Sequence, residues 1–291
     1  MKTIVIIHNL NSRGKNINED YVRELLNKKG IRFHYFQTKR ISDVDGIINK
    51  YNNPSEFQYC SIGGDGSLNA LVNSLMKNNI TMPEVSCLPG GSGSDFIRTF
   101  ALPQNIEEAV EHLNNENFYE VDVGLIKNDT NAKYFINVLN IGFLASTVEV
   151  SEKFPNLFRA FRYPISFWIK IITARAREMS ISNDKYEFKG MAFNICVCNA
   201  QYFGGGWNIS PKSSLQDGLF NIQVFAVTKL KAMQIFFLAK KGLHLKESSV
   251  KLKRLSQLTV NSKDPIEIDG DFFGYGPAEI FIKKRAIRFK I

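Results

Sequence analysis

Two glycine-rich loops, each preceded by a strand-like run and followed by a helix-like run, constrain the fold of this chain more than any other feature. The first covers residues 63–69 (GGDGSLN) and the second residues 88–98 (LPGGSGSDFIR). Strand-like and helix-like runs alternate through the first third of the chain, which predicts a parallel sheet with helices on both faces. Loops that follow neighbouring strands of such a sheet meet at one edge. We therefore expect the two loops to form one site.

Hydrophobic periodicity predicts the positions of the elements. The first third contains predicted strands at 3–9, 31–38, 57–62 and 84–88, and predicted helices at 19–29, 42–51, 67–78 and from about 94. Later strands are predicted at 118–126, 133–142, 191–199, 219–227, 257–261, 266–269 and 279–283, with helices only at 147–178 and 228–240. The predicted fold is α/β: residues 1–122 form a parallel-sheet nucleotide-binding domain, and residues 123–291 form a mainly antiparallel β-sandwich domain.

The residue types in the loops are suited to phosphate. Glycines let backbone N–H groups approach a ligand, and a helix N-terminus adds partial positive charge. Asp65 would repel an anion unless Mg²⁺ lies between them or its carboxylate orients a reacting hydroxyl. The alternative is a tight strand-to-helix turn in which Asp65 only caps the helix. The second loop repeats this chemistry with three glycines, two hydroxyls and Asp95.

Several other classes of protein are disfavoured. The sequence contains no G-x-x-x-x-G-K-[ST] motif, no G-x-G-x-x-G after the first strand, and no H-R-D or D-F-G signature of a protein kinase. The four cysteines form no C-x-x-C pair, so we expect buried thiols rather than a disulfide or a zinc site. The net charge of +9 favours phosphate-bearing partners. No apolar run approaches the ~20 residues of a spanning helix, and the N-terminal run is too short for a signal peptide. We expect a cytoplasmic protein with peripheral membrane contact.

The first loop resembles the G-G-D-G-T-x-N motif of the diacylglycerol kinase catalytic family, which includes sphingosine, ceramide and bacterial lipid kinases and is distantly akin to NAD kinases. The second loop is similar to the family's P-x-G-T-x-N-D-F-A-R. Four more motifs follow the family order: a degraded N-P-x-S-G-x-G-K at 9–15, D-x-G at 122–124, N-x-x-x-x-G-G-G…P…D-G-L at 199–219, and D-G-D at 269–271 in place of D-G-E. The resemblance spans nearly the whole chain.

This resemblance implies an active site between two domains, with ATP and Mg²⁺ as cofactors and a lipid hydroxyl, of diacylglycerol or a similar alcohol, as acceptor. It implies a metal held by Asp217 and by the carbonyl groups of Ser214 and Leu219. It implies that the D-G-E carboxylate accepts the proton, with Asp65 a further catalytic candidate. ATP would be bound by Asn9, Thr38, Gly63, Gly64, Asp65, Gly66, Ser67, Asn69, Gly91, Ser92 and Asp95.

Two departures from the family pattern leave questions open. Asp271 replaces the family's Glu and is one methylene shorter, so either Asp271 or Asp269 is the base. Leu144 stands where many relatives carry Asp, which bears on the choice of acceptor. Two alternative functions also remain: a kinase for a soluble substrate, of the NAD kinase type, and a nucleotide-binding regulator without turnover.

A basic and aromatic stretch at 154–177 (FPNLFRAFRYPISFWIKIITARAR) predicts contact with an anionic membrane. The alternative is an amphipathic helix packed on the β domain. The expected partners are ATP and a lipid substrate at an anionic membrane surface, with no nucleic acid. The sequence leaves a homodimer open.

Overall fold

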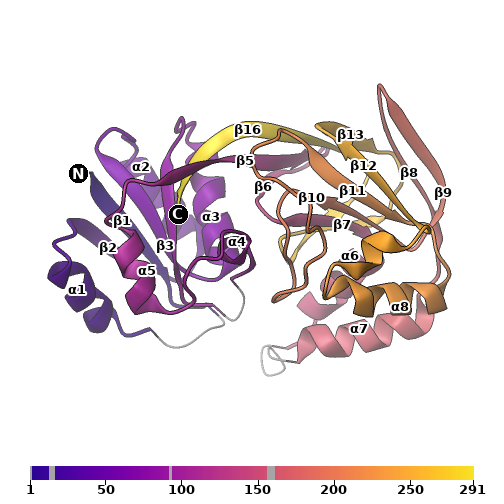
Figure 1. Ribbon diagram of the computed structural model, residues 1–291, viewed down its shortest axis with the longest axis horizontal. Coiled ribbons are helices and arrows are strands. Elements are labelled where there is room, and N and C mark those ends of the chain that lie inside the picture. Colours follow the sequence, from indigo (N-terminus) through magenta and orange to yellow (C-terminus); the bar gives the residue numbers. More distant parts are fainter. Residues whose placement is uncertain (1, 13–16, 92–93, 156–160) are drawn as a thin grey trace. The chain divides into compact units, whose positions relative to one another are not determined.

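The computed structural model describes residues 2–12, 17–91, 94–155 and 161–291 (Figure 1). The chain divides into two compact units. Unit 1 contains the chain up to Val123 together with Leu215–Asp217 and Lys283–Ile291, and unit 2 contains Gly124–Ser214 and Gly218–Ile282. The predicted fold class is confirmed, because a mostly parallel α/β sheet is combined with a separate antiparallel sheet.

Unit 1 is built on parallel strands in the order β2 (Phe33–Thr38), β1 (Thr3–Asn9), β3 (Phe57–Gly63) and β4 (Glu84–Pro89). The end of β16 (Ala278–Lys290) pairs in parallel with β4. One face of this sheet buries Ile4 and Ile6 against Val22 of α1 and Val110 of α5. Strand residues alternate between faces, so the intervening residues face α2 and α3. The helices are α1 (Glu19–Lys28), α2 (Ile41–Lys50), α3 (Asp65–Lys77), α4 (Asp95–Thr99) and α5 (Ile106–His112).

Asp122 explains why two distant segments belong to unit 1. Its Oδ1 accepts a hydrogen bond from the backbone N–H of Arg285 over 2.7 Å. Its own N–H donates to the carbonyl oxygen of Leu215 over 2.6 Å. A fully buried carboxylate requires such partners, because desolvation of an unpaired charge is costly.

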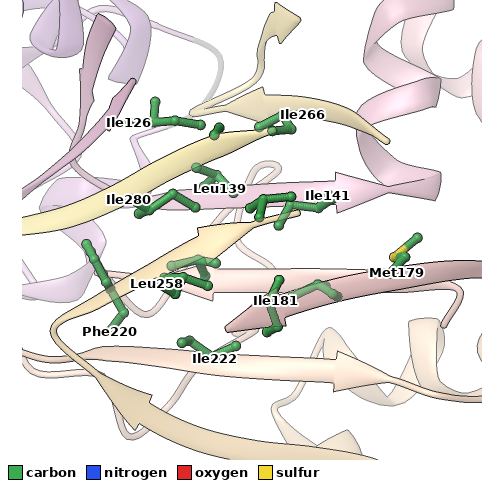
Figure 2. Close-up of a cluster of buried hydrophobic side chains, with 14 of the residues drawn as sticks. Ile126, Leu139, Ile141, Met179, Ile181, Phe220, Ile222, Leu258, Ile266 and Ile280 are labelled. Carbon is green, nitrogen blue, oxygen red and sulfur yellow. The ribbon is translucent and has the colours of Figure 1, made fainter. Parts of the chain in front are cut away.

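Unit 2 contains two layers of strands. One is an antiparallel sheet in the order β12 (Val250–Leu255), β11 (Phe220–Phe225), β10 (Asn194–Cys198), β7 (Val138–Gly142), β14 (Pro265–Ile268) and β15 (Asp271–Tyr275). The other contains β16, β13 (Gln257–Val260), β8 (Arg177–Asn183) and β9 (Tyr186–Ala192), with β5 (Phe118–Lys127) paired to β16 and to β6 (Ala132–Phe135). Alternate residues of both layers form one apolar core, as with Leu139, Ile181 and Ile266 (Figure 2).

The helices of unit 2 are α6 (Phe143–Glu152), α7 (Arg162–Thr173) and α8 (Lys229–Ala239), followed by the 3₁₀ turn η2 (Leu243–Lys246). The prediction of one helix over 147–178 is therefore wrong. Phe154 precedes Pro155, and the residue before a proline disfavours the helical conformation. The segment from Arg177 has the two-residue period of a strand, since Met179 and Ile181 are buried.

Several elements of the described chain were not predicted from the sequence: α5, β8, β9, η2, β12 and β15. All four cysteines are free, and three of them are buried, in agreement with the expectation of thiols. Within the described ranges, no helix combines the length and the apolar character needed to cross a bilayer.

Candidate active site

Predicted nucleotide-binding residues lie at the carboxyl edge of the sheet in unit 1. Asn9 and Thr38 are register partners at the ends of β1 and β2, and Gly63 and Pro89 are partners at the ends of β3 and β4. The side-chain amide of Asn9 donates from Nδ2 to Oγ of Ser67 over 3.0 Å. The degraded N-terminal motif and the first glycine-rich loop are thus in direct contact.

The two glycine-rich loops also touch each other. The N–H of Gly90 donates to the carbonyl oxygen of Gly63 over 3.0 Å. A Cβ added at Gly90 would lie 3.2 Å from the backbone nitrogen of Gly63, and one added at Gly63 would lie 2.2 Å from Oγ of Ser67. Gly63 also has φ +154°, which side chains rarely adopt. Both glycines are therefore required by close approach, as expected for loops that meet at one edge.

Asp65 has a structural role that the sequence did not predict. It is the first residue of α3, yet its carboxylate accepts hydrogen bonds from backbone groups of the second loop. Oδ2 accepts from the N–H of Asp95, and Oδ1 accepts from the N–H of Phe96, each over 2.9 Å. Asp65 thus caps α4 rather than its own helix and joins the two loops. Each carboxylate oxygen keeps a further lone pair, so a ligand can still bind there.

The other predicted residues of this unit differ in their surroundings. Thr38 is buried and donates from Oγ1 to the carbonyl oxygen of His8 over 3.4 Å, while the Asn69 carbonyl groups accept from Asn73 over 2.9 Å. Asp95 is buried, with Oδ1 3.8 Å from Nε of Arg98. Gly64 is the N-cap of α3, Gly91 is half-buried, and Ser92 lies outside the described residues.

The first turn of α3 is open enough for a phosphate group. A Cβ added at Gly66 would meet no heavy atom of the described residues within 4 Å. The first N–H groups of a helix have no intrahelical acceptor, so those near Gly66 can donate to an anion. The residues present therefore fit the triphosphate of ATP.

The predicted metal ligands Ser214, Asp217 and Leu219 lie just before β11, and all three are half-buried. One carboxylate and two carbonyl oxygens are the hard donors that Mg²⁺ prefers. Across the parts of the chain that are described, no three His, Cys, Asp or Glu side chains gather into a metal-binding group. The proposed set has a single carboxylate, so its role stays a prediction.

The two carboxylates of the D-G-D turn, residues 269–271, have different surroundings. Asp269 has φ +50°, and its carboxylate accepts three hydrogen bonds of 2.8–3.0 Å from the N–H groups of Ile136, Asn137 and Val138. Asp271 is 59% exposed, and its Oδ2 lies 2.9 Å from Nζ of Lys133. Asp269 thus fixes the turn to the start of β7, whereas Asp271 faces solvent.

Glu267 is a buried acidic residue that motif comparison missed. It is 4% exposed and accepts hydrogen bonds from Asn140 Nδ2 and, over 2.9 Å, from the N–H of Gly270. The pKa of Glu267 is raised to about 8: burial is the main cause and the charges of Asp269 and Asp271 add to it, while the two hydrogen bonds act in the opposite direction. Strand alternation could have found this residue: Ile266 and Ile268 face the sandwich core, which puts Glu267 on the other face.

That other face of the antiparallel sheet contains an apolar cavity of about 60 Å³. Its walls come from α6, α7, α8 and β10. Aromatic rings pack around it, with Phe167 stacked on Phe236 at 4.7 Å and Phe236 lying 4.2 Å from Trp207. The residues that line it include Phe143, Leu144, Phe167, Asn194, Cys196 and Phe236.

The outer sides of α7 and α8 carry large apolar side chains. Trp168 and Ile172 of α7 are 58% and 74% exposed, and Leu230 and Phe237 of α8 are 77% and 67% exposed. No Asp or Glu occurs at 153–177 or 228–246, whereas both stretches contain several Lys or Arg residues. In the described part of the 154–177 stretch, which leaves out 156–160, α7 packs on one side and exposes apolar residues on the other, and contact with a membrane stays a prediction.

Two family models match consecutive parts of the chain. The family model "Diacylglycerol kinase catalytic domain" matches residues 3–126, and the model "YegS C-terminal NAD kinase beta sandwich-like domain" matches residues 137–290. The diacylglycerol kinase of Staphylococcus haemolyticus (strain JCSC1435) is 28% identical over 232 residues, which cover 77% of this chain and 68% of that protein. The diacylglycerol kinase of Bacillus subtilis (strain 168) is 27% identical over 222 residues, covering 75% and 72%.

Solved structures show the same fold. A diacylglycerol kinase from Bacillus anthracis str. Sterne has a TM-score of 0.75 and 18% identity, covering 99% of this chain and 96% of that one. A second structure from the same organism has a TM-score of 0.77 and 22% identity, with coverage of 99% and 95%. At these identities the likeness establishes the fold alone.

Proposed function

Because the chain belongs to the diacylglycerol kinase-like lipid kinase family, we propose that it transfers the γ-phosphoryl group of Mg-ATP to the hydroxyl group of a lipid, diacylglycerol or a similar alcohol. The family supports kinase activity in general. The observation that supports a lipid as the substrate is the apolar cavity of unit 2. The phosphates and ribose hydroxyls of NAD would lose their hydration in an apolar cavity, whereas an acyl chain gains about 0.8 kcal/mol for each buried methylene group.

The paired loops of unit 1 are proposed to hold ATP. The free N–H groups at the start of α3 would donate to phosphate oxygens, and Asn9 and Ser67 add an amide and a hydroxyl at the same edge. Asp65 keeps both loops in the geometry that the phosphates need. Mg²⁺ neutralises charge on the phosphate groups when it is bound. Asp217, with the carbonyl oxygens of Ser214 and Leu219, offers oxygen donors for a metal.

Asp271 is the proposed general base. Its carboxylate faces solvent, and its only cost in accepting a proton from the lipid hydroxyl is the loss of the ion pair with Lys133. An exposed pair of this kind contributes only about 0–1 kcal/mol. Asp269 is proposed to hold the turn rather than to take the proton, since its carboxylate already accepts three backbone hydrogen bonds.

The acyl chain is proposed to enter between α7 and α8. A water needs about 10–15 Å³ of such a cavity, so 60 Å³ is room for about four to six waters. That is too little for an acyl chain, and the two helices would have to move apart. The exposed apolar and basic side chains of the same helices would meet an anionic bilayer. We place the protein in the cytoplasm, peripherally at the inner face of the membrane.

The test is to incubate the chain with labelled ATP and a panel of acceptors in mixed micelles, and to identify the labelled product. The panel contains diacylglycerol, monoacylglycerol, ceramide and sphingosine, with NAD as the soluble acceptor. We expect a phosphorylated lipid, with turnover that depends on Mg²⁺. The Asp271→Asn variant is the control for the chemical step. Labelled NADP would favour a soluble-substrate kinase, and ATP binding without product on any acceptor would favour a regulator; either result contradicts the proposal.

A further inference from the structure

A row of polar side chains crosses the antiparallel sheet of unit 2 on the face that carries the helices. Cross-strand register places Glu267 of β14 opposite Asn140 of β7, Asn140 opposite Cys196 of β10, and Cys196 opposite Gln223 of β11. All four side chains are buried. Buried polar groups are costly unless they are hydrogen-bonded, so such a row needs a reason.

Part of this row belongs to a continuous chain of hydrogen bonds. The N–H of Leu144, in the first turn of α6, donates to Oδ1 of Asn194 over 3.0 Å. Nδ2 of Asn194 donates to Oδ1 of Asn140 over 3.1 Å. Nδ2 of Asn140 donates to Oε1 of Glu267, whose Oε2 accepts the N–H of Gly270 over 2.9 Å. The chain thus runs from α6 to the middle of the D-G-D turn.

The groups at the two ends of this chain of hydrogen bonds fix the direction in which every bond donates. A backbone N–H can only donate, so Asn194 must offer its oxygen to Leu144 and its nitrogen to Asn140. Asn140 must then offer its nitrogen to position 267, where Gly270 also donates. Position 267 therefore needs two acceptor oxygens. A carboxyl group provides them, because each of its oxygens can accept whether or not the group carries a proton, but the amide of Gln provides one acceptor and one donor group.

The ends of the chain also lie at the two functional parts of unit 2. Leu144 and Asn194 line the apolar cavity, and Gly270 separates the two carboxylates of the turn. We propose that this chain holds the D-G-D turn in register with the apolar cavity, and that Asn194, Asn140 and Glu267 are positioning residues for the reaction. The proposal rests on the proposed function, because it names the residues that align base and lipid.

Two substitutions and their combination test this chain of hydrogen bonds. Glu267→Gln leaves two donors facing each other, since the new amide cannot accept from both Asn140 and Gly270. Asn140→Asp removes the amide donor to Glu267 and sets two acidic side chains side by side, which repel each other when both are ionised. The double variant satisfies every group again. The amide at 267 accepts from Gly270 and donates to the carboxylate at 140, which still accepts from Asn194.

Gln223→Leu is the matched control. Gln223 is a fully buried member of the same row, but its Nε2 donates to the carbonyl oxygen of Ile209 over 2.7 Å and to Sγ of Cys198 over 3.8 Å, and its Oε1 lies 2.9 Å from Nε2 of His244. Its loss removes buried hydrogen bonds without touching the chain to the turn. It therefore reports what a purely structural defect does.

We expect each single variant to lower kcat by at least about tenfold with little change in the KM for ATP, since a misplacement of ~1 Å can cost about 10²-fold. The double variant should recover most of this loss. Gln223→Leu should lower the melting temperature and leave kcat per folded molecule near the wild-type value. Unchanged kcat in Glu267→Gln, no recovery in the double variant, or an equal loss in Gln223→Leu would overturn the proposal.

Amide hydrogen exchange at Gly270 tests the chain even if the wild type phosphorylates no lipid. We expect a protected amide in the wild type, faster exchange in Glu267→Gln, and restored protection in the double variant. An absence of lipid kinase activity with this exchange pattern would refute the proposed function and leave the hydrogen-bonded chain in place. Equal exchange in the wild type and Glu267→Gln would refute the chain itself.

Discussion

Replacement of Asp65 by Asn should weaken both the fold of unit 1 and catalysis. The carboxylate accepts from the N–H groups of Asp95 and Phe96, each over 2.9 Å. An amide keeps one acceptor oxygen and turns an NH₂ group toward the other N–H. One of the two backbone donors at the start of α4 therefore loses its partner, and the contact between the glycine-rich loops is broken on one side.

The size of the effect follows from these two bonds. A hydrogen bond to a charged group contributes about 1.5–3 kcal/mol, a neutral one about 0.5–1.5 kcal/mol, and an unsatisfied buried donor costs about 1–3 kcal/mol. The change from two charged bonds to one neutral bond and one partly exposed orphan should lower the free energy of unfolding by about 2–4 kcal/mol. Turnover should nearly vanish, because the loops that position the phosphates are no longer aligned.

The assay is urea unfolding monitored by far-UV circular dichroism, together with turnover of the folded fraction. Asp43→Asn is the matched control, since the Asp43 carboxylate also accepts two backbone N–H groups, from Lys39 over 3.0 Å and Arg40 over 2.9 Å, but at an exposed helix start. That variant should lose less stability and keep its turnover. A stable and active Asp65→Asn variant, or equal losses in the two variants, would refute this account of the loop contact.

Four further predictions follow from the other sites. Because the pKa of Glu267 is raised to about 8, the folded chain should lose stability as pH rises from about 4.5 to 8, by at most about 5 kcal/mol. Urea unfolding should show that Glu267→Gln removes this pH dependence, and parallel pH curves for the variant and the wild type would contradict it. Asp271→Asn should lower kcat about 10²–10⁴-fold while Asp271→Glu stays active, whereas Asp269→Asn should mainly lower the melting temperature; the reverse pattern would move the base to Asp269. Asp217→Ala should lower stability or turnover with partial rescue by high Mg²⁺, and an unchanged Mg²⁺ dependence would remove the metal site. Binding to anionic vesicles should weaken as salt rises and in Trp168→Ala, and equal binding to neutral vesicles would remove the electrostatic part of the argument.

Much of the fold could be predicted because its signals are local. The apolar runs of β1 and β3 and the glycines after them predict strand, turn and helix from neighbouring residues alone. The wrong helix at 147–178 and the missed strand β15 have another cause. The helix predicted at 147–178 overlooked the break at Pro155 and the two-residue period that begins at Arg177, and β15 is stabilised mainly by pairing with β14.

The candidate site was predictable in its members but not in their contacts. Motif spacing brought Asn9, Gly63 and Asp65 into one hypothesis, and the structure places them at one sheet edge. No local pattern could say that Asp65 caps α4, because its partners are 30 and 31 residues further along the chain. The same limit applies to Glu267, whose partner Asn140 is distant in sequence.

The D-G-D turn illustrates how contacts distinguish residues that a motif treats alike. To accept a proton, Asp269 would have to give up at least one of three charge-assisted hydrogen bonds, at about 1.5–3 kcal/mol. Asp271 would have to release only Lys133, at about 0–1 kcal/mol for an exposed pair. The difference of about 0.5–3 kcal/mol corresponds to roughly two- to 150-fold in rate. It favours Asp271 as the base even with its shortened side chain, because Asp269, anchored to the start of β7, and Gly270, held by Glu267, together fix the backbone from which Asp271 projects.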